Sequence, residues 1–85
     1  MAASKRPRNA VPAFVRTALR EAGLSRRYQL RPAYQRNDYI GWITRGKLAQ
    51  TRTRRLQQML DELRKGDVYM KMRWKPRQGK QAFRR

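Results

Sequence analysis

Cysteine and histidine are both missing from this chain of 85 residues. Their absence excludes a disulfide bond, a thiol nucleophile, an imidazole base and a zinc site of the usual ligands. Carboxylates are scarce too: there are 5, and none stands in the pattern of a paired general acid and base. We therefore expect a protein that is not an enzyme and that needs no cofactor and no metal.

Long apolar runs are also lacking. No stretch approaches the roughly 18 apolar residues of a membrane-spanning helix. The positively charged start is not followed by the apolar segment of a secretory signal. These absences predict a cytoplasmic protein with no integral membrane segment.

Positive charge is abundant. The 23 Lys and Arg residues against 5 Asp and Glu give a net charge of +18, and the pI is near 11.9. Repulsion on this scale opposes a compact state unless a polyanion offsets it. Nucleic acid is the first polyanion to consider, and anionic lipid headgroups are the second.

Apolar residues recur at helical spacing over most of the chain. The spacing predicts helices over about 12–22, 25–30, 33–45 and 51–65. Gly23 and Gly66 suit the left-handed residue that often ends a helix, and Pro32 stops the second helix. Ser25 is the expected N-terminal cap of the second helix, and Thr51 or Gln50 is the candidate cap of the fourth.

The central helix pair organises the predicted core. Gly46 separates its two helices, and each helix has large apolar residues three and four positions apart. The residues expected to pack between them are Trp42, Ile43, Leu56, Met59, Leu60 and Leu63. Phe14 in the first helix, and Tyr28 and Leu30 in the second, are also expected to be buried.

After the last predicted helix the pattern changes to a period of two. Apolar side chains alternate with polar ones at Val68, Met70, Met72 and Trp74. Because no second strong strand is present, we expect this segment to lie extended along the helices without forming a sheet.

The two ends of the chain, residues 1–10 and 75–85, are basic and lack apolar periodicity. The predicted fold class is therefore all-α. It consists of a small helical domain over residues 11–74 with a central helix pair, flanked by basic extended N- and C-terminal arms.

The start of the fourth predicted helix carries Arg52, Arg54 and Arg55. Cations in a first turn oppose the helix dipole, and such departures from local preference tend to mark functional sites. If the helix start faces a phosphate, backbone N–H groups and guanidinium groups converge on the same anion. Alternatively, Arg55 pairs with a carboxylate and Arg52 extends over the core.

Tyr34, near a helix start, is the aromatic side chain best suited to an exposed stacking contact. With cations of the core and both arms it forms the predicted nucleic-acid-binding set: Lys5, Arg6, Arg8, Tyr34, Arg36, Arg45, Lys47, Arg52, Arg54, Arg55, Lys75, Arg77, Lys80, Arg84 and Arg85. The first functional hypothesis is a small basic protein that binds phosphate backbones. The hypothesis favours RNA over DNA as the partner and includes association with a ribosomal particle. An anionic membrane surface is the alternative partner.

The segments YQRNDYIGWITRGK and TRTRRLQQMLDELRKGDVYM resemble the helical domain of the YdeI/OmpD-associated family of bacteriocin-protection proteins. The residues that carry the resemblance are Tyr39, Trp42, Ile43, Lys47, Thr51, Arg52, Arg55 and Gly66. One departure is Gly46, where the family usually has alanine. The resemblance implies a bacterial protein with an all-helical core. It also implies a second functional hypothesis, protection against bacteriocins or antimicrobial peptides at an anionic envelope surface.

Overall fold

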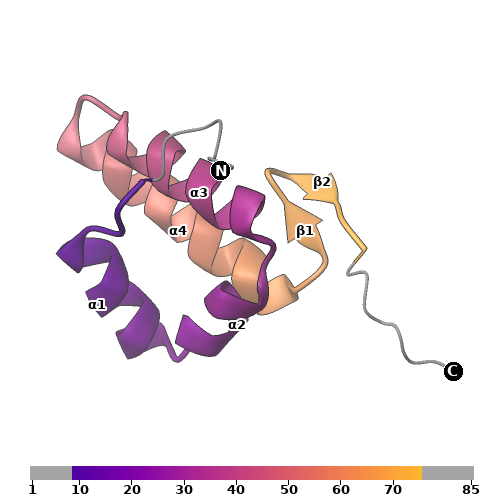
Figure 1. The fold of residues 1–85 in the computed structure, drawn as a ribbon. Coiled ribbons are helices and arrows are strands. Elements are labelled where there is room, and N and C mark those ends of the chain that lie inside the picture. The colour runs from indigo at the N-terminus through magenta and orange to yellow at the C-terminus, as the bar shows by residue number, and fades with distance from the viewer. Residues whose placement is uncertain (1–8, 76–85) are drawn as a thin grey trace, which may run out of the picture.

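Helices dominate the part of the chain that the computed structural model describes, residues 9–75 (Figure 1). In this part α1 spans Ala13–Ala22, α2 Ser25–Leu30, α3 Ala33–Thr44 and α4 Ala49–Lys65, and the strands are β1, Val68–Tyr69, and β2, Met72–Arg73. The predicted all-α class is confirmed. The predicted arm cations Lys5, Arg6, Arg8, Arg77, Lys80, Arg84 and Arg85 lie outside the described residues. The boundaries of the domain and its arms stay a prediction.

Helix C-termini follow the glycine and proline positions. Gly23 and Gly66 are left-handed, with φ of 71° and 85°, and they end α1 and α4 as predicted. Pro32 disfavours a helical conformation for Arg31, which is extended, and α2 stops there.

The predicted N-terminal caps are wrong. Ser25 is the first residue of α2, and α4 begins at Ala49, ahead of both Gln50 and Thr51. Leucines occupy the capping positions, and neither helix start has a side-chain cap hydrogen bond. The first turn of α4 is held by its backbone, with the Thr51 and Arg52 N–H groups donating to the Leu48 carbonyl oxygen at 3.0 and 3.1 Å.

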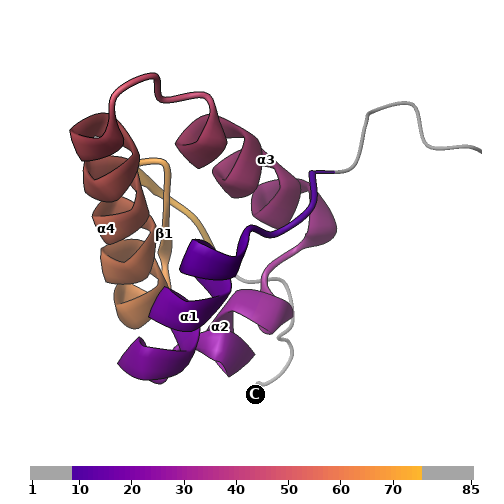
Figure 2. The same cartoon turned by 90° about the vertical axis from the view of Figure 1, so that its left-hand side faces the viewer.

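The core lies between α3 and α4, with α1 and α2 packed against this pair (Figure 2). Its buried apolar residues are Val15, Leu19, Leu24, Tyr28, Tyr39, Ile40, Ile43, Leu56, Met59, Leu60 and Leu63. Every residue predicted for the core of the central pair is buried except Trp42, which is half-buried against it. The apolar stripes of the central helices therefore face each other, as their spacing predicted.

Two side chains predicted to be buried are exposed: Phe14 is 44% exposed and Leu30 is 71% exposed. Positions two apart on a helix point roughly 200° apart, so Leu30 faces away from the core when Tyr28 is buried. On α1 the buried positions are Val15 and Leu19, and Phe14 lies beside that stripe.

Residues 68–73 form a hairpin, contrary to the prediction of an unpaired extended segment. β1 and β2 are antiparallel, with Tyr69 opposite Met72. The two turn residues, Met70 and Lys71, both have positive φ, 51° and 66°. Turns of this kind normally contain Gly, Asn or Asp, so the sequence carries no ordinary hairpin signal at these positions.

Leu60 offers a direct test of the core, because its side chain is only 4% exposed. The substitution Leu60→Ala should lower the free energy of unfolding by about 2–5 kcal/mol, since it removes buried methyl groups and leaves a cavity. Urea unfolding followed by circular dichroism measures this loss. Gln57→Ala, at an exposed position of the same helix, is the control and should change stability by less than about 0.5 kcal/mol. Equal stability of the two variants would contradict the core described here.

Candidate functional site

Two arginines at the start of α4 reach back over the α3–α4 connection. Nη1 of Arg52 donates hydrogen bonds to the carbonyl oxygens of Gly46 and Lys47 at 2.7 and 3.2 Å. Nη1 of Arg55 donates to the Trp42 carbonyl oxygen at 2.6 Å, and its guanidinium lies 5.3 Å from the centre of the Trp42 ring. These contacts account for cations in the first turns of α4 without a bound anion.

The electrostatics of α3 explains why these cations are tolerated. Trp42 lies in the last turn of α3, where the carbonyl groups carry partial negative charge. Arg55 is unfavourable for the N-terminus of α4 but favourable for the C-terminus of α3, and Arg52 binds carbonyl groups of the connection that follows α3. Gly46 permits this close approach, since a Cβ atom there would lie 3.0 Å from Thr51 Cγ2 and 3.1 Å from Arg52 Cγ.

Arginines make the same kind of contact at the C-terminus of α4. Nη1 of Arg27, from α2, donates to the Arg64 carbonyl oxygen at 2.7 Å. Arg31, which follows α2 and is buried, donates from Nη2 to the Glu62 carbonyl oxygen at 3.0 Å. Its guanidinium also lies 4.6 Å from the centre of the Trp74 ring. The Arg27 bond satisfies a carbonyl group that the end of a helix leaves open, whereas the Glu62 carbonyl oxygen also accepts from the Gly66 N–H at 2.9 Å. Both bonds tie the α2 segment to α4.

Other predicted cations of the described region remain on the surface. Arg45, Lys47, Arg54 and Lys75 are exposed, and none of their side chains forms a hydrogen bond or ion pair with another residue in 9–75. We refer to Arg45, Lys47 and Arg54, which lie around the α3–α4 connection, as the connection cations. Arg36 differs from them, because it is half-buried and its Nε donates to the Arg31 carbonyl oxygen at 3.1 Å.

The prediction set omitted several cations that are also exposed: Arg20, Arg26, Arg64, Lys71 and Arg73. Tyr34, the predicted stacking residue, is 48% exposed. Its ring lies edge-on to Tyr69, with the ring centres 5.9 Å apart, and its hydroxyl accepts a hydrogen bond from Gln35 Nε2 at 3.2 Å. The exposed cations are therefore spread over several elements and do not converge on Tyr34.

Glu62 is a buried carboxylate that the sequence analysis did not predict. Its side chain is 3% exposed, and four donors reach its two carboxylate oxygens. The Tyr39 hydroxyl and the Met70 N–H (2.8 Å) donate to Oε1, while Gln58 Nε2 (3.0 Å) and the Lys71 N–H (2.9 Å) donate to Oε2. One carboxylate thus joins α3, α4 and the hairpin turn.

The Tyr39 phenol is held in its protonated form at this site. Burial raises the pKa of Tyr39 far above its ordinary value, and the hydrogen bond to the Glu62 carboxylate raises it further. The hydroxyl is therefore a stable donor at neutral pH. A sequence signal for this site did exist, because Glu62 lies three positions after Met59 and falls within the apolar stripe of α4.

A family model described as bacteriocin-protection, YdeI or OmpD-associated, matches residues 10–66. The match covers more than half of the 85 residues and includes the whole of α1, α2, α3 and α4. This chain belongs to that family. No curated protein and no solved structure matches the chain significantly.

Membership in the YdeI/OmpD-associated family contradicts the principal functional prediction. Charge favoured nucleic-acid binding, with RNA and the ribosome as partners, whereas the family is described by bacteriocin protection. The error has a physical reason: a high positive charge does not identify which polyanion it attracts. At the Arg-rich helix start, which seemed to favour phosphate, Arg52 and Arg55 bind carbonyl groups, and only Arg54 remains exposed.

Several residues that carry the family resemblance hold the fold together. Tyr39 binds the buried carboxylate, Trp42 lies against Arg55, and Arg52 spans the α3–α4 connection. Gly66 ends α4.

The described residues contain neither a membrane-spanning helix nor a metal-binding cluster. Between residues 9 and 75, no helix is long and apolar enough to cross a membrane. The acidic side chains of this region form no group of three that could hold a metal ion.

Glu62→Gln tests the buried carboxylate. Glutamine keeps one oxygen but replaces the other with an NH₂ group, which cannot accept a hydrogen bond from Met70 or Lys71. The free energy of unfolding should fall by about 1–3 kcal/mol, because a buried donor loses its acceptor. Urea unfolding measures the loss, and amide hydrogen exchange should become faster in the hairpin.

Asp61→Asn is the matched control for this substitution. The Asp61 carboxylate is exposed, and it lies 3.2 Å from Lys65 Nζ. Its loss should cost less than about 1 kcal/mol, since exposed ion pairs contribute little. If Glu62→Gln is no more destabilising than this control, the carboxylate does not hold the hairpin in place.

Proposed function

We propose that this protein protects bacterial cells against bacteriocins by binding, from the cytoplasmic side, an anionic surface of the cell envelope, and that it does so without catalysis. The observation that carries the proposal is the family match over residues 10–66. The exposed cations would supply the attraction. Anionic lipids give a membrane surface a negative potential, which draws nearby Lys and Arg side chains toward it.

The connection cations support this contact. Arg45, Lys47 and Arg54 are exposed, and their side chains are not engaged by other residues of 9–75. Each cation near an anionic membrane surface contributes about 1 kcal/mol of binding free energy. The three connection cations together would therefore contribute about 3 kcal/mol to the free energy of a reversible surface contact.

Exposed apolar side chains adjoin cations in two short segments. Leu48 is 62% exposed and follows Lys47, and Met72 is 60% exposed between Lys71 and Arg73. Apolar groups beside cations can enter the boundary between headgroups and acyl chains while the cations remain at the phosphates. The large apolar stripes of the helices are used in the core, so the proposed contact is shallow.

A contact of this kind provides a route to protection. Antimicrobial peptides that bind membranes are commonly rich in Lys and Arg on their polar face. A folded cationic protein at the inner surface would compete with a membrane-spanning bacteriocin for anionic headgroups on that side.

The double substitution Lys47→Gln with Arg54→Gln tests the surface contact. Binding to phosphatidylglycerol vesicles should weaken about 10- to 30-fold, since two cations are removed at about 1 kcal/mol each. Co-sedimentation with vesicles at physiological ionic strength measures the affinity. The matched control is Gln50→Ala with Thr53→Ala, at exposed neutral positions of α4, and should bind like the wild type. Phosphatidylcholine vesicles should bind the wild type far more weakly.

The protective role is tested with the same variants in cells. Bacteria that produce the wild type or the neutral control should survive a cationic bacteriocin better than cells without the protein, and the Lys47/Arg54 variant should protect less. Vesicle binding without any gain in survival would rule out the protective role. Full protection by a variant that no longer binds vesicles would rule out the surface contact as its cause.

A further inference from the structure

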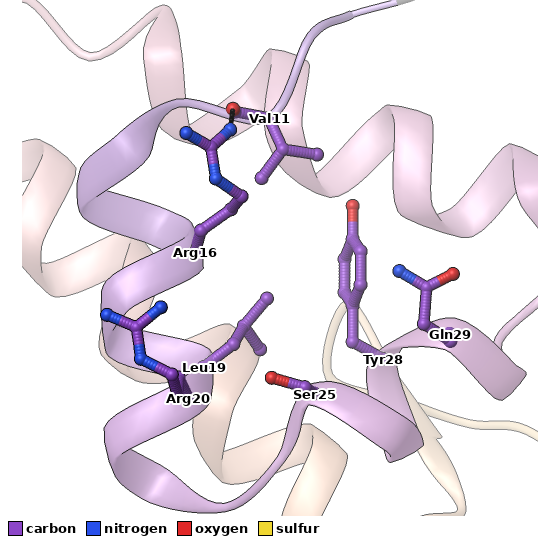
Figure 3. Close-up of a pocket in the computed structure, with 7 residues that line it drawn as sticks. All are labelled: Val11, Arg16, Leu19, Arg20, Ser25, Tyr28 and Gln29. Atoms are coloured by element: carbon purple, nitrogen blue, oxygen red, sulfur yellow. Dashed lines mark hydrogen bonds between the residues drawn. The ribbon is translucent and has the colours of Figure 1, made fainter.

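A pocket of about 220 Å³ lies between α1 and α2 (Figure 3). Val11, Leu19 and the ring of Tyr28 supply its apolar wall. Leu19 and Tyr28 are only 3% and 4% exposed, so this wall belongs to the core and is held in place by it. A pocket of this size is below the range typical of drug-sized ligands and suits a smaller molecule.

Two guanidinium groups lie on the α1 side of the pocket (Figure 3). Arg16 and Arg20 are four positions apart, a spacing at which like charges repel on a helix. Nη1 of Arg16 donates to the Val11 carbonyl oxygen at 2.7 Å, and its other N–H groups remain available. The Arg20 side chain is exposed and makes no hydrogen bond or ion pair within residues 9–75. An anion between the two side chains would offset their repulsion.

The Tyr28 hydroxyl is a second, independent indication of a ligand. Tyr28 is buried, but its hydroxyl forms no hydrogen bond with any other residue that the structure describes. Buried polar groups are nearly always hydrogen-bonded, so an open hydroxyl in a pocket wall calls for a partner. Burial raises the pKa of Tyr28, with the Arg36 charge acting in the opposite direction, and the phenol can therefore donate at neutral pH.

Polar groups on the α2 side complete the arrangement. Ser25 and Gln29 line the pocket there, opposite the two arginines (Figure 3). None of the side chains that form the described lining is acidic. The pocket thus combines an apolar wall, two cations and several neutral donors, which suits a molecule with one anionic and one apolar part.

We propose that this pocket binds a small organic anion, a carboxylate or phosphate monoester on a short aromatic or aliphatic body. The anionic group lies between Arg16 and Arg20, and the body packs against Val11, Leu19 and the Tyr28 ring. Because one liquid water occupies about 30 Å³, the space corresponds to roughly seven water-sized groups, enough for the apolar body, while the anionic group lies at the exposed edge with Arg16 and Arg20. The inference goes beyond the proposed function, and it does not depend on the connection cations.

Phenyl phosphate is the probe that tests the proposal. In a titration followed by ¹⁵N NMR, saturable shifts should centre on the backbone amides of Val11, Leu19, Ser25 and Gln29. Inorganic phosphate lacks the apolar body and phenol lacks the charge, so each should bind at least about tenfold more weakly. A soluble short-chain phosphatidic acid is titrated in parallel. Tighter binding than phenyl phosphate at the same amides supports a lipid phosphate as the source, and weaker binding there supports a free organic anion.

Three variants decide whether the pocket is the site. Arg20→Gln should weaken phenyl phosphate binding about tenfold or more, because it removes a charged donor, and Tyr28→Phe should weaken it severalfold. Arg26→Gln is the matched control, since Arg26 is exposed but does not line the pocket, and should change affinity less than about twofold. Equal weakening by Arg20→Gln and Arg26→Gln would overturn the proposal. Shifts that do not saturate, or that spread over all exposed cations, would overturn it as well.

Discussion

The buried carboxylate of Glu62 is the interaction on which the rest of the described structure depends. A charged group that is 3% exposed is tolerated only when hydrogen bonds replace its lost hydration. Tyr39 and Gln58 supply side-chain donors from α3 and α4, and the backbone N–H groups of Met70 and Lys71 supply two more. These last bonds offset the cost of two positive-φ residues in the turn, so one group fixes both helix packing and the hairpin.

A second constraint is the excess of cations over carboxylates. With 23 basic and 5 acidic residues, ion pairs cannot neutralise most of the arginines. Carbonyl groups at helix C-termini take the place of carboxylates: Arg27 and Arg31 bind the end of α4, and Arg55 binds the end of α3. A chain of charge +18 can therefore use some arginines to hold its helices together and still present others to an anionic partner.

Local pattern predicted much of the fold, and distant contacts determined the rest. Helical spans and the core stripe follow from apolar spacing, which depends on neighbours along the chain. The hairpin was missed because Met70 and Lys71 are not typical residues of its turn. Of the candidate site, exposed cations such as Arg54 were predictable, but the direction of Arg55 depends on where α3 ends in space. The α1–α2 pocket likewise forms only when the two helices pack together, and no sequence motif predicts it.

Arg54 and Arg55 are neighbours in the chain, and comparing them tests most directly whether some arginines stabilise the fold while others are free at the surface. Arg54 is exposed, with no partner among residues 9–75, whereas Arg55 binds the Trp42 carbonyl oxygen and lies against its ring. Urea unfolding should show that Arg55→Gln lowers the free energy of unfolding by about 1–3 kcal/mol. Arg54→Gln should change it by less than about 0.5 kcal/mol. Equal effects of the two substitutions, or a larger loss for Arg54→Gln, would contradict the account.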